Sequence, residues 1–148
     1  MLSRFANQLQ NRWMDLSAYP DMRPDYKMRK QVNQYLSDRP LYGVVEWHQR
    51  FWYPLRVQRV VSEFVYEILR ECSGLEVGRL LPSDRLMTEL QLPMVCWFDW
   101  EIAWTEQFVS RFELETDWIL DIGEFETLQD FVVALNALLK QQPKSSYK

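Results

Sequence analysis

Apolar residues recur along this chain at spacings of three and four, which is the period of one face of an α-helix. The most regular run follows Arg56 and spans four turns, with Val57, Val60, Val61, Phe64, Val65, Ile68, Leu69 and Cys72. Ser73 and Gly74 come next, and glycine often closes a helix because it adopts the left-handed conformation without a Cβ clash. The pattern predicts a helix that ends at Gly74.

Two further helices are predicted nearer the C-terminus. One has an aromatic face made by Trp97, Trp100, Trp104, Phe108 and Phe112, and Asp99 is its expected N-cap. The other begins at Thr127, because Thr127 and Asp130 have the spacing of a capping box. This last helix is expected to bury Leu128, Phe131, Leu135 and Leu138.

Prolines interrupt the N-terminal third of the chain. A first helix is predicted from a stripe of Leu2, Phe5, Leu9, Trp13 and Leu16. Pro20 and Pro24 end it, since neither has an N–H to donate. A second helix is predicted over about residues 25–36. Residues 44–52 favour a third helix, broken by Pro54, although residues 42–47 could instead form a strand.

The net charge of −4 conceals two halves of opposite sign. Residues 1–60 hold ten Lys and Arg against five Asp and Glu, whereas residues 61–148 hold seven against sixteen. The halves either attract each other, or one face steers a charged partner. A nucleic-acid partner is disfavoured, because the basic residues are scattered among acids without a recognised motif.

Cys72 and Cys96 are the only cysteines. They have neither a CxxC nor a Cys/His spacing, which predicts reduced thiols in a cytoplasmic protein without structural zinc. No apolar run approaches the roughly 20 residues of a membrane span, and the N-terminus lacks the apolar stretch of a signal peptide. We therefore expect a protein that binds no membrane.

Catalytic chemistry has few candidate residues. His48 is the only histidine, so neither a metal site with several histidines nor a Ser-His-Asp triad with a further base is expected. A buried, hydrogen-bonded role suits His48 better. Glu63, Glu67 and Glu71 have the i, i+4, i+8 spacing of a solvated helix face, and the glycines stand too far apart for a phosphate loop. The sequence predicts a non-enzymatic protein without metal or cofactor.

Three stretches resemble acyl carrier proteins. Residues 81–90 (LPSDRLMTEL) resemble the loop in which carriers place an apolar residue, two spacers and Asp-Leu-Gly, with Gln91 in place of that glycine. Residues 99–112 resemble their acidic second helix, which ends in Glu-Phe, and residues 126–132 (ETLQDFV) resemble the Thr-Val-x-Asp start of their last helix. The resemblance implies a mainly α fold, with a four-helix carrier-like bundle over residues 56–140. Residues 1–55 would be a helical extension that packs on this core, and residues 141–148 a flexible tail.

The chain departs from carriers at the modified serine. Carriers attach 4′-phosphopantetheine to the serine of an Asp-Ser-Leu motif, whereas here Cys96 or Phe98 takes that place, in the stretch VCWFD. The resemblance therefore implies the scaffold and its presentation of one helix to protein partners, without the carrier activity.

Seven tryptophans are the most unusual feature of the composition. They either fill the core or line a groove for a partner, since tryptophan is enriched at interface hot spots. The predicted partner-binding residues are Trp97, Phe98, Trp100, Trp104, Trp47 and Trp52, with Asp99, Glu101 and Glu106 as a polar rim.

The expected function is a non-catalytic adaptor or assembly factor that binds a partner's helix or tail, with basic residues, in this aromatic groove. The sequence also resembles small cyanobacterial proteins, which implies a role in carboxysome or photosynthetic assembly. The alternative is a divergent carrier or acyl- or lipid-binding protein.

Overall fold

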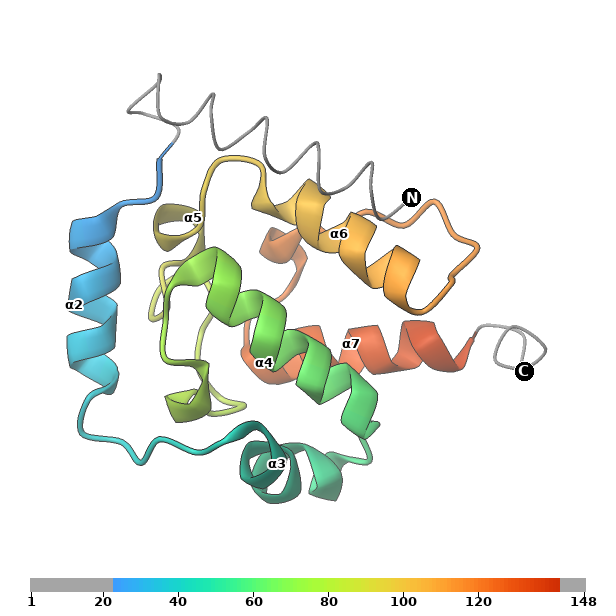
Figure 1. Ribbon diagram of the computed structural model, residues 1–148, viewed down its shortest axis with the longest axis horizontal. Helices are drawn as coiled ribbons and strands as arrows, with labels where there is room; N and C mark the ends of the chain where they lie inside the picture. Colours follow the sequence, from blue (N-terminus) through green and yellow to red (C-terminus); the bar gives the residue numbers. More distant parts are fainter. Residues whose placement is uncertain (1–22, 142–148) are drawn as a thin grey trace.

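The computed structural model describes residues 23–141, which are mainly helical and contain no β-strand. The α-helices are α2 (Tyr26–Leu36), α3 (Val44–Trp47), α4 (Arg59–Ser73), α5 (Leu92–Val95), α6 (Trp100–Arg111) and α7 (Leu128–Lys140). One π-helical turn (His48–Trp52) and three 3-10 turns (Tyr53–Leu55, Val77–Arg79 and Ile122–Glu124) complete them. The helix predicted over residues 2–16 and most of the predicted tail lie outside the described residues. Figure 1 shows α4 crossing between α6 and α3, with α7 beside it.

The helix predicted from the longest apolar stripe is confirmed as α4. Its stripe is buried from Val61 to Cys72. Gly74 is the C-cap with φ +70°, and its N–H donates to the carbonyl of Arg70 at 3.0 Å. The left-handed closure that the sequence predicted at this glycine is therefore present.

The two predicted C-terminal helices are also confirmed. In α7 the hydroxyl of Thr127 accepts from the Asp130 N–H at 3.2 Å, and the Asp130 carboxylate accepts from the Thr127 N–H at 3.1 Å. Asp99 occupies the N-cap position of α6, but its side chain makes no capping hydrogen bond. Local spacing thus located the starts of both helices. Of the two, α7 has the predicted capping hydrogen bonds and α6 does not.

Residues 44–55 form one continuous helical segment, so the strand alternative for residues 42–47 is wrong. The segment passes from α3 through the π turn into the 3-10 turn without stopping at Pro54. Pro54 lies in the first turn of the 3-10 segment, where its missing N–H removes none of the hydrogen bonds within that segment. The chain reverses instead at Arg56, whose φ is +60°.

The described part of the N-terminal third shares one hydrophobic core with α4 to α7. Val32 and Leu36 of α2 are buried in it, as are Trp47 and Trp52. The indole N–H of Trp47 donates to the carbonyl of Leu80 at 3.0 Å, and its ring meets that of Trp52 edge to face. These two tryptophans therefore anchor residues 44–55 against α4 and the loop that follows it.

Two backbone hydrogen bonds fasten the long loop between α4 and α6 to the start of α7. The Leu86 N–H donates to the Glu126 carbonyl, and the Leu128 N–H donates to the Asp84 carbonyl. Gln91 has φ +53°, in the left-handed region that glycine favours.

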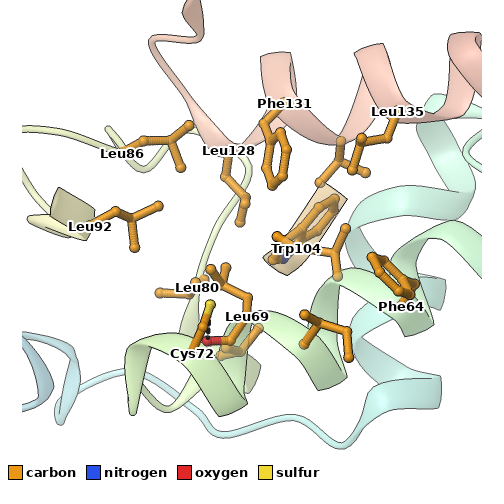
Figure 2. Close-up of a cluster of buried hydrophobic side chains, with 14 of the residues drawn as sticks. Phe64, Leu69, Cys72, Leu80, Leu86, Leu92, Trp104, Leu128, Phe131 and Leu135 are labelled. Carbon is orange, nitrogen blue, oxygen red and sulfur yellow. Dashed lines mark hydrogen bonds between the residues drawn. The ribbon is translucent and has the colours of Figure 1, made fainter. Parts of the chain in front are cut away.

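The centre of the core lies between α4, α6 and α7. Figure 2 shows the indole of Trp104 between α7 above and α4 below, near Phe131 and Phe64. The Trp104 ring is 4.8 Å from that of Phe64 and 5.1 Å from that of Phe131, measured between centroids. Within residues 23–141, no helix is both long and apolar enough to span a membrane.

Candidate functional site

A pocket of about 200 Å³ opens between α4 and α6. Helix α4 contributes Ile68, Glu71 and Cys72, and the α6 side is lined by Trp97, Trp100, Ala103, Trp104 and Gln107. On α6, positions 100, 103, 104 and 107 have the i, i+3, i+4, i+7 spacing of one helix face. The small side chain of Ala103 between two tryptophans leaves space that a larger residue would fill.

The pocket is apolar at its base and polar at its edge. Trp100, Trp104 and Cys72 are buried, whereas the Glu71 carboxylate is exposed and Gln107 is half-buried. An apolar group could therefore be desolvated at the base while a polar or charged group meets Glu71 at the mouth.

Three of the six predicted partner-binding residues line this pocket, and the other three lie elsewhere. Trp97, Trp100 and Trp104 line it. Phe98 is 63% exposed in the turn before α6 but is not part of the lining. Trp47 and Trp52 are fully buried in the core around α3, so the structure does not bring them to the same surface.

Trp104 contributes more to the core than to the pocket. It is 1% exposed, and its ring packs on Phe64, Phe108 and Phe131. Its indole N–H has no hydrogen-bond acceptor among the described residues. Packing alone therefore holds the ring in place.

Five lining residues were not among the sequence candidates: Ile68, Glu71, Cys72, Ala103 and Gln107. Ala103 and Gln107 follow from the helical spacing once Trp100 is chosen. The three residues of α4 could be found only by knowing that this face of α4 lies against α6, which local patterns do not reveal.

The polar rim expected from α6 differs in the structure. A Glu101 carboxylate oxygen accepts from the Ile122 N–H at 2.8 Å, and the Thr105 hydroxyl accepts from the Leu120 N–H at 2.9 Å. Glu101 and Thr105 therefore fasten residues 120–122 to α6. The carboxylate at the pocket edge belongs to Glu71 on the opposite helix.

His48 and Ser62 form a buried pair whose Nδ1 and Oγ atoms are 2.6 Å apart. The Ser62 hydroxyl also lies 3.1 Å from the carbonyl of Arg59, to which it donates. Ser62 is fully buried, so a substrate cannot reach its hydroxyl. The pair joins α4 to the π-helical turn, in agreement with the buried, hydrogen-bonded role expected for His48.

We expect His48 to make the protein less stable in mild acid. Burial lowers the pKa of His48, and Arg59 lowers it further against an opposing effect of Glu63. Between this lowered pKa and the unfolded value of about 6.5, the unfolded chain binds more protons, so stability is lost as the pH falls through that window. Urea unfolding at pH 7.5, 6.5 and 5.5 should show a decrease of at most about 1.4 kcal/mol per pH unit. His48→Gln should flatten this slope, and an equal slope in the variant would contradict the assignment.

No phosphopantetheine should be found on the protein. Residues 92–99 (LPMVCWFD) contain no serine or threonine, and the thiol of Cys96 is buried. Burial, followed by the contact with Cys72, raises the pKa of Cys96 well above its ordinary value, which keeps the thiol protonated and unreactive. The intact mass should stay unchanged after incubation with coenzyme A and a phosphopantetheinyl transferase, and a gain of that group would refute this prediction.

Across residues 23–141, no cluster of three or more His, Cys, Asp or Glu side chains is placed to hold a metal ion. No protein-family model, curated protein or solved structure matches the chain. Function is therefore inferred from the pocket and from the sequence.

Proposed function

We propose that this protein is a non-catalytic binding module that holds one large apolar side chain of a partner segment in the pocket between α4 and α6. The observation that carries the proposal is the lining itself, where three tryptophans, Ile68 and Cys72 surround a space with a carboxylate at its edge. Tryptophan-lined pockets of this kind suit the anchor residues that dominate protein interfaces.

The volume favours a single side chain as the occupant. Pockets for drug-sized ligands span about 300–1,000 Å³, whereas a dry cavity of about 150 Å³ holds one benzene molecule. At about 200 Å³, the pocket suits one aromatic or branched side chain better than a long acyl chain. This favours the adaptor over the acyl- or lipid-binding alternative.

The charge around the pocket favours a partner with basic residues beside its anchor. Glu71 lines the mouth, and Glu67 and Glu63 continue along α4, where they meet Arg111 and Arg59. Burying an aromatic anchor would contribute roughly 4–6 kcal/mol before the cost of association. A flanking Lys or Arg near Glu71 would add orientation and specificity more than affinity.

The scaffold proposed for this module is a carrier-like bundle over residues 56–140. The order of α4, loop, α6, short 3-10 turn and α7 supports it, as does the left-handed backbone at Gln91. In carriers, the helix that corresponds to α6 meets partner enzymes, so the pocket would use the same helix. The role in carboxysome or photosynthetic assembly stays a prediction from the resemblance, because the pocket identifies no process.

A pocket-filling substitution should abolish this binding. We would select peptides from a random displayed library on the wild-type protein and expect one aromatic or large aliphatic residue with neighbouring Lys or Arg. Ala103→Phe should weaken the best peptide at least tenfold, because the new ring occupies the space between Trp100 and Trp104. The dissociation constants are measured by fluorescence anisotropy of the labelled peptide.

Ala137→Phe is the matched control, since Ala137 is exposed on α7 and does not line the pocket. It should change the affinity less than twofold, and both variants should keep the wild-type thermal transition within a few degrees. Peptides that bind Ala103→Phe as tightly as the wild type, or that contain no apolar anchor, would refute the proposal.

A further inference from the structure

An exposed turn precedes α4 and is held between two buried residues. Trp52 and Val57 are buried at its ends, and the Val57 N–H donates to the Trp52 carbonyl at 3.1 Å. Inside the turn, the Arg56 N–H donates to the Tyr53 carbonyl at 3.0 Å. All four residues of the turn are exposed, and we call residues 53–56 the corner. Because its backbone is already fixed, the corner can enter a binding site with little loss of conformational entropy.

The corner presents an aromatic side chain to solvent. The aromatic side chains that are more than half exposed among residues 23–141 are Tyr26, Tyr35, Tyr53 and Phe98. Tyr53 is the most exposed of them, at 65%. A guanidinium lies 5.1 Å from the ring centroid of Tyr26, and the Tyr35 hydroxyl already donates to a carboxylate at 2.8 Å. An acidic residue directly follows Phe98. Tyr53 is therefore the side chain of this set that best fits an anchor with basic neighbours.

The charges beside Tyr53 are opposite in sign to the charge at the pocket. Arg56 is exposed three residues after Tyr53, and Arg50 is exposed three residues before it. Arg50 pairs with Glu46, so these three charged residues leave a net positive charge beside the anchor. The pocket mouth carries the exposed carboxylate of Glu71. Opposite charges of this kind favour the encounter of the two surfaces and fix their orientation.

The corner of one chain cannot fill the pocket of the same chain. The corner precedes α4, whereas the pocket is lined by Ile68, Glu71 and Cys72 near the other end of that helix. At 1.5 Å per residue, Arg59 and Glu71 are about 18 Å apart along the axis of α4. In Figure 1, α4 starts at the turn that follows α3 and ends on the side of the molecule where α5 lies. A corner that enters the pocket must therefore come from another copy of the chain.

We propose that Tyr53 of one copy occupies the pocket between α4 and α6 of a second copy, so that the chain associates with itself head to tail. This inference rests on the proposed function, because it names the partner of the same pocket. The corner and the pocket are different surfaces, so each copy can give one anchor and accept another. Such a contact builds open chains of copies, or rings where the rotation closes.

Sedimentation velocity of the full-length protein tests the association. The wild type should form assemblies that grow with protein concentration, and Tyr53→Ser should weaken the association at least tenfold. Tyr26→Ser, which removes another exposed tyrosine with a neighbouring cation, should stay within twofold of the wild type. Raising the salt concentration should weaken the association, because salt screens the charges beside the anchor and the pocket. A wild type that stays monomeric, or association that strengthens with salt, would overturn the proposal.

A mixture of two variants tests which surfaces meet. Ala103→Phe fills the pocket but keeps the anchor, whereas Tyr53→Ser keeps the pocket but lacks the anchor. Each variant alone should be monomeric, and the mixture should form one-to-one complexes and nothing larger, because a single anchor and a single pocket remain to be joined. A mixture that stays monomeric, or that builds assemblies as large as those of the wild type, contradicts the proposed contact.

Peptide selection on Tyr53→Ser separates this inference from the proposed function. The variant leaves the pocket intact and without an anchor from another copy, so it should select the same class of peptides with an aromatic or large aliphatic residue. If it selects them while the wild type is monomeric at every concentration, the self-association is wrong and the proposed function stands. If it selects no such peptide and the mixture of variants does not associate, both are wrong.

Discussion

Replacing Trp104 with alanine should lower the free energy of unfolding by about 3–5 kcal/mol, the usual loss for a buried aromatic residue truncated to a methyl group. The ring is 1% exposed and stands between Phe64, Phe108 and Phe131. Its removal would leave a cavity between α4, α6 and α7, which the surrounding helices can fill only in part. Equilibrium unfolding in urea measures the change directly.

Phe98→Ala and Trp104→Phe are the comparisons that make this result informative. Phe98 is 63% exposed, so its truncation should change the free energy of unfolding by no more than about 0.5 kcal/mol. Trp104→Phe should cost less than Trp104→Ala, because it keeps a ring in the cluster and removes an indole N–H that has no acceptor among residues 23–141. A stable Trp104→Ala protein would mean that this tryptophan belongs to the surface.

The helices with strong local signals were predictable from the sequence. Gly74 and the Thr127–Asp130 pair act on backbone groups within four residues of themselves, so their positions determine where α4 ends and α7 begins. Residues 42–47 were ambiguous because a short apolar run fits both a strand and a helix. The hydrogen bond from the Trp47 indole N–H to the carbonyl of Leu80, 33 residues away, accompanies the helical outcome.

The candidate site was predictable only in part, because tryptophan at helical spacing is compatible with both a core and an interface. The sequence could not separate Trp104, whose ring packs on Phe131, from Trp97, which is half-buried and lines the pocket. Nor could it show that Ala103 lines the pocket while Ile102, one residue earlier on α6, is exposed outside it. These distinctions depend on contacts between residues that are distant in the sequence.

Replacing Arg39 with alanine should also lower the free energy of unfolding by about 3–5 kcal/mol, because it would leave a buried carboxylate without its cation. The side chain of Asp84 is 3% exposed and accepts two hydrogen bonds from the Arg39 guanidinium, at 2.8 and 3.0 Å, and a third from the Leu81 N–H. This pair joins the α2–α3 connection to the long loop before α6. Its loss should therefore loosen the two parts together, which urea unfolding would record as one cooperative transition at lower denaturant.

Arg50→Ala is the matched control for this prediction. Arg50 pairs with Glu46 at 3.0 Å, but the two side chains are 53% and 55% exposed. Water already solvates both charges, so the loss should be at most about 0.5 kcal/mol. The loss in the free energy of unfolding for Arg39→Lys should fall between these values, because an ammonium keeps the charge near Asp84 but cannot make the bidentate contact of a guanidinium. If Arg39→Ala were no more harmful than Arg50→Ala, Asp84 would have to be reached by water, and the long loop would be held by its other contacts, among them those with Trp47 and with the start of α7.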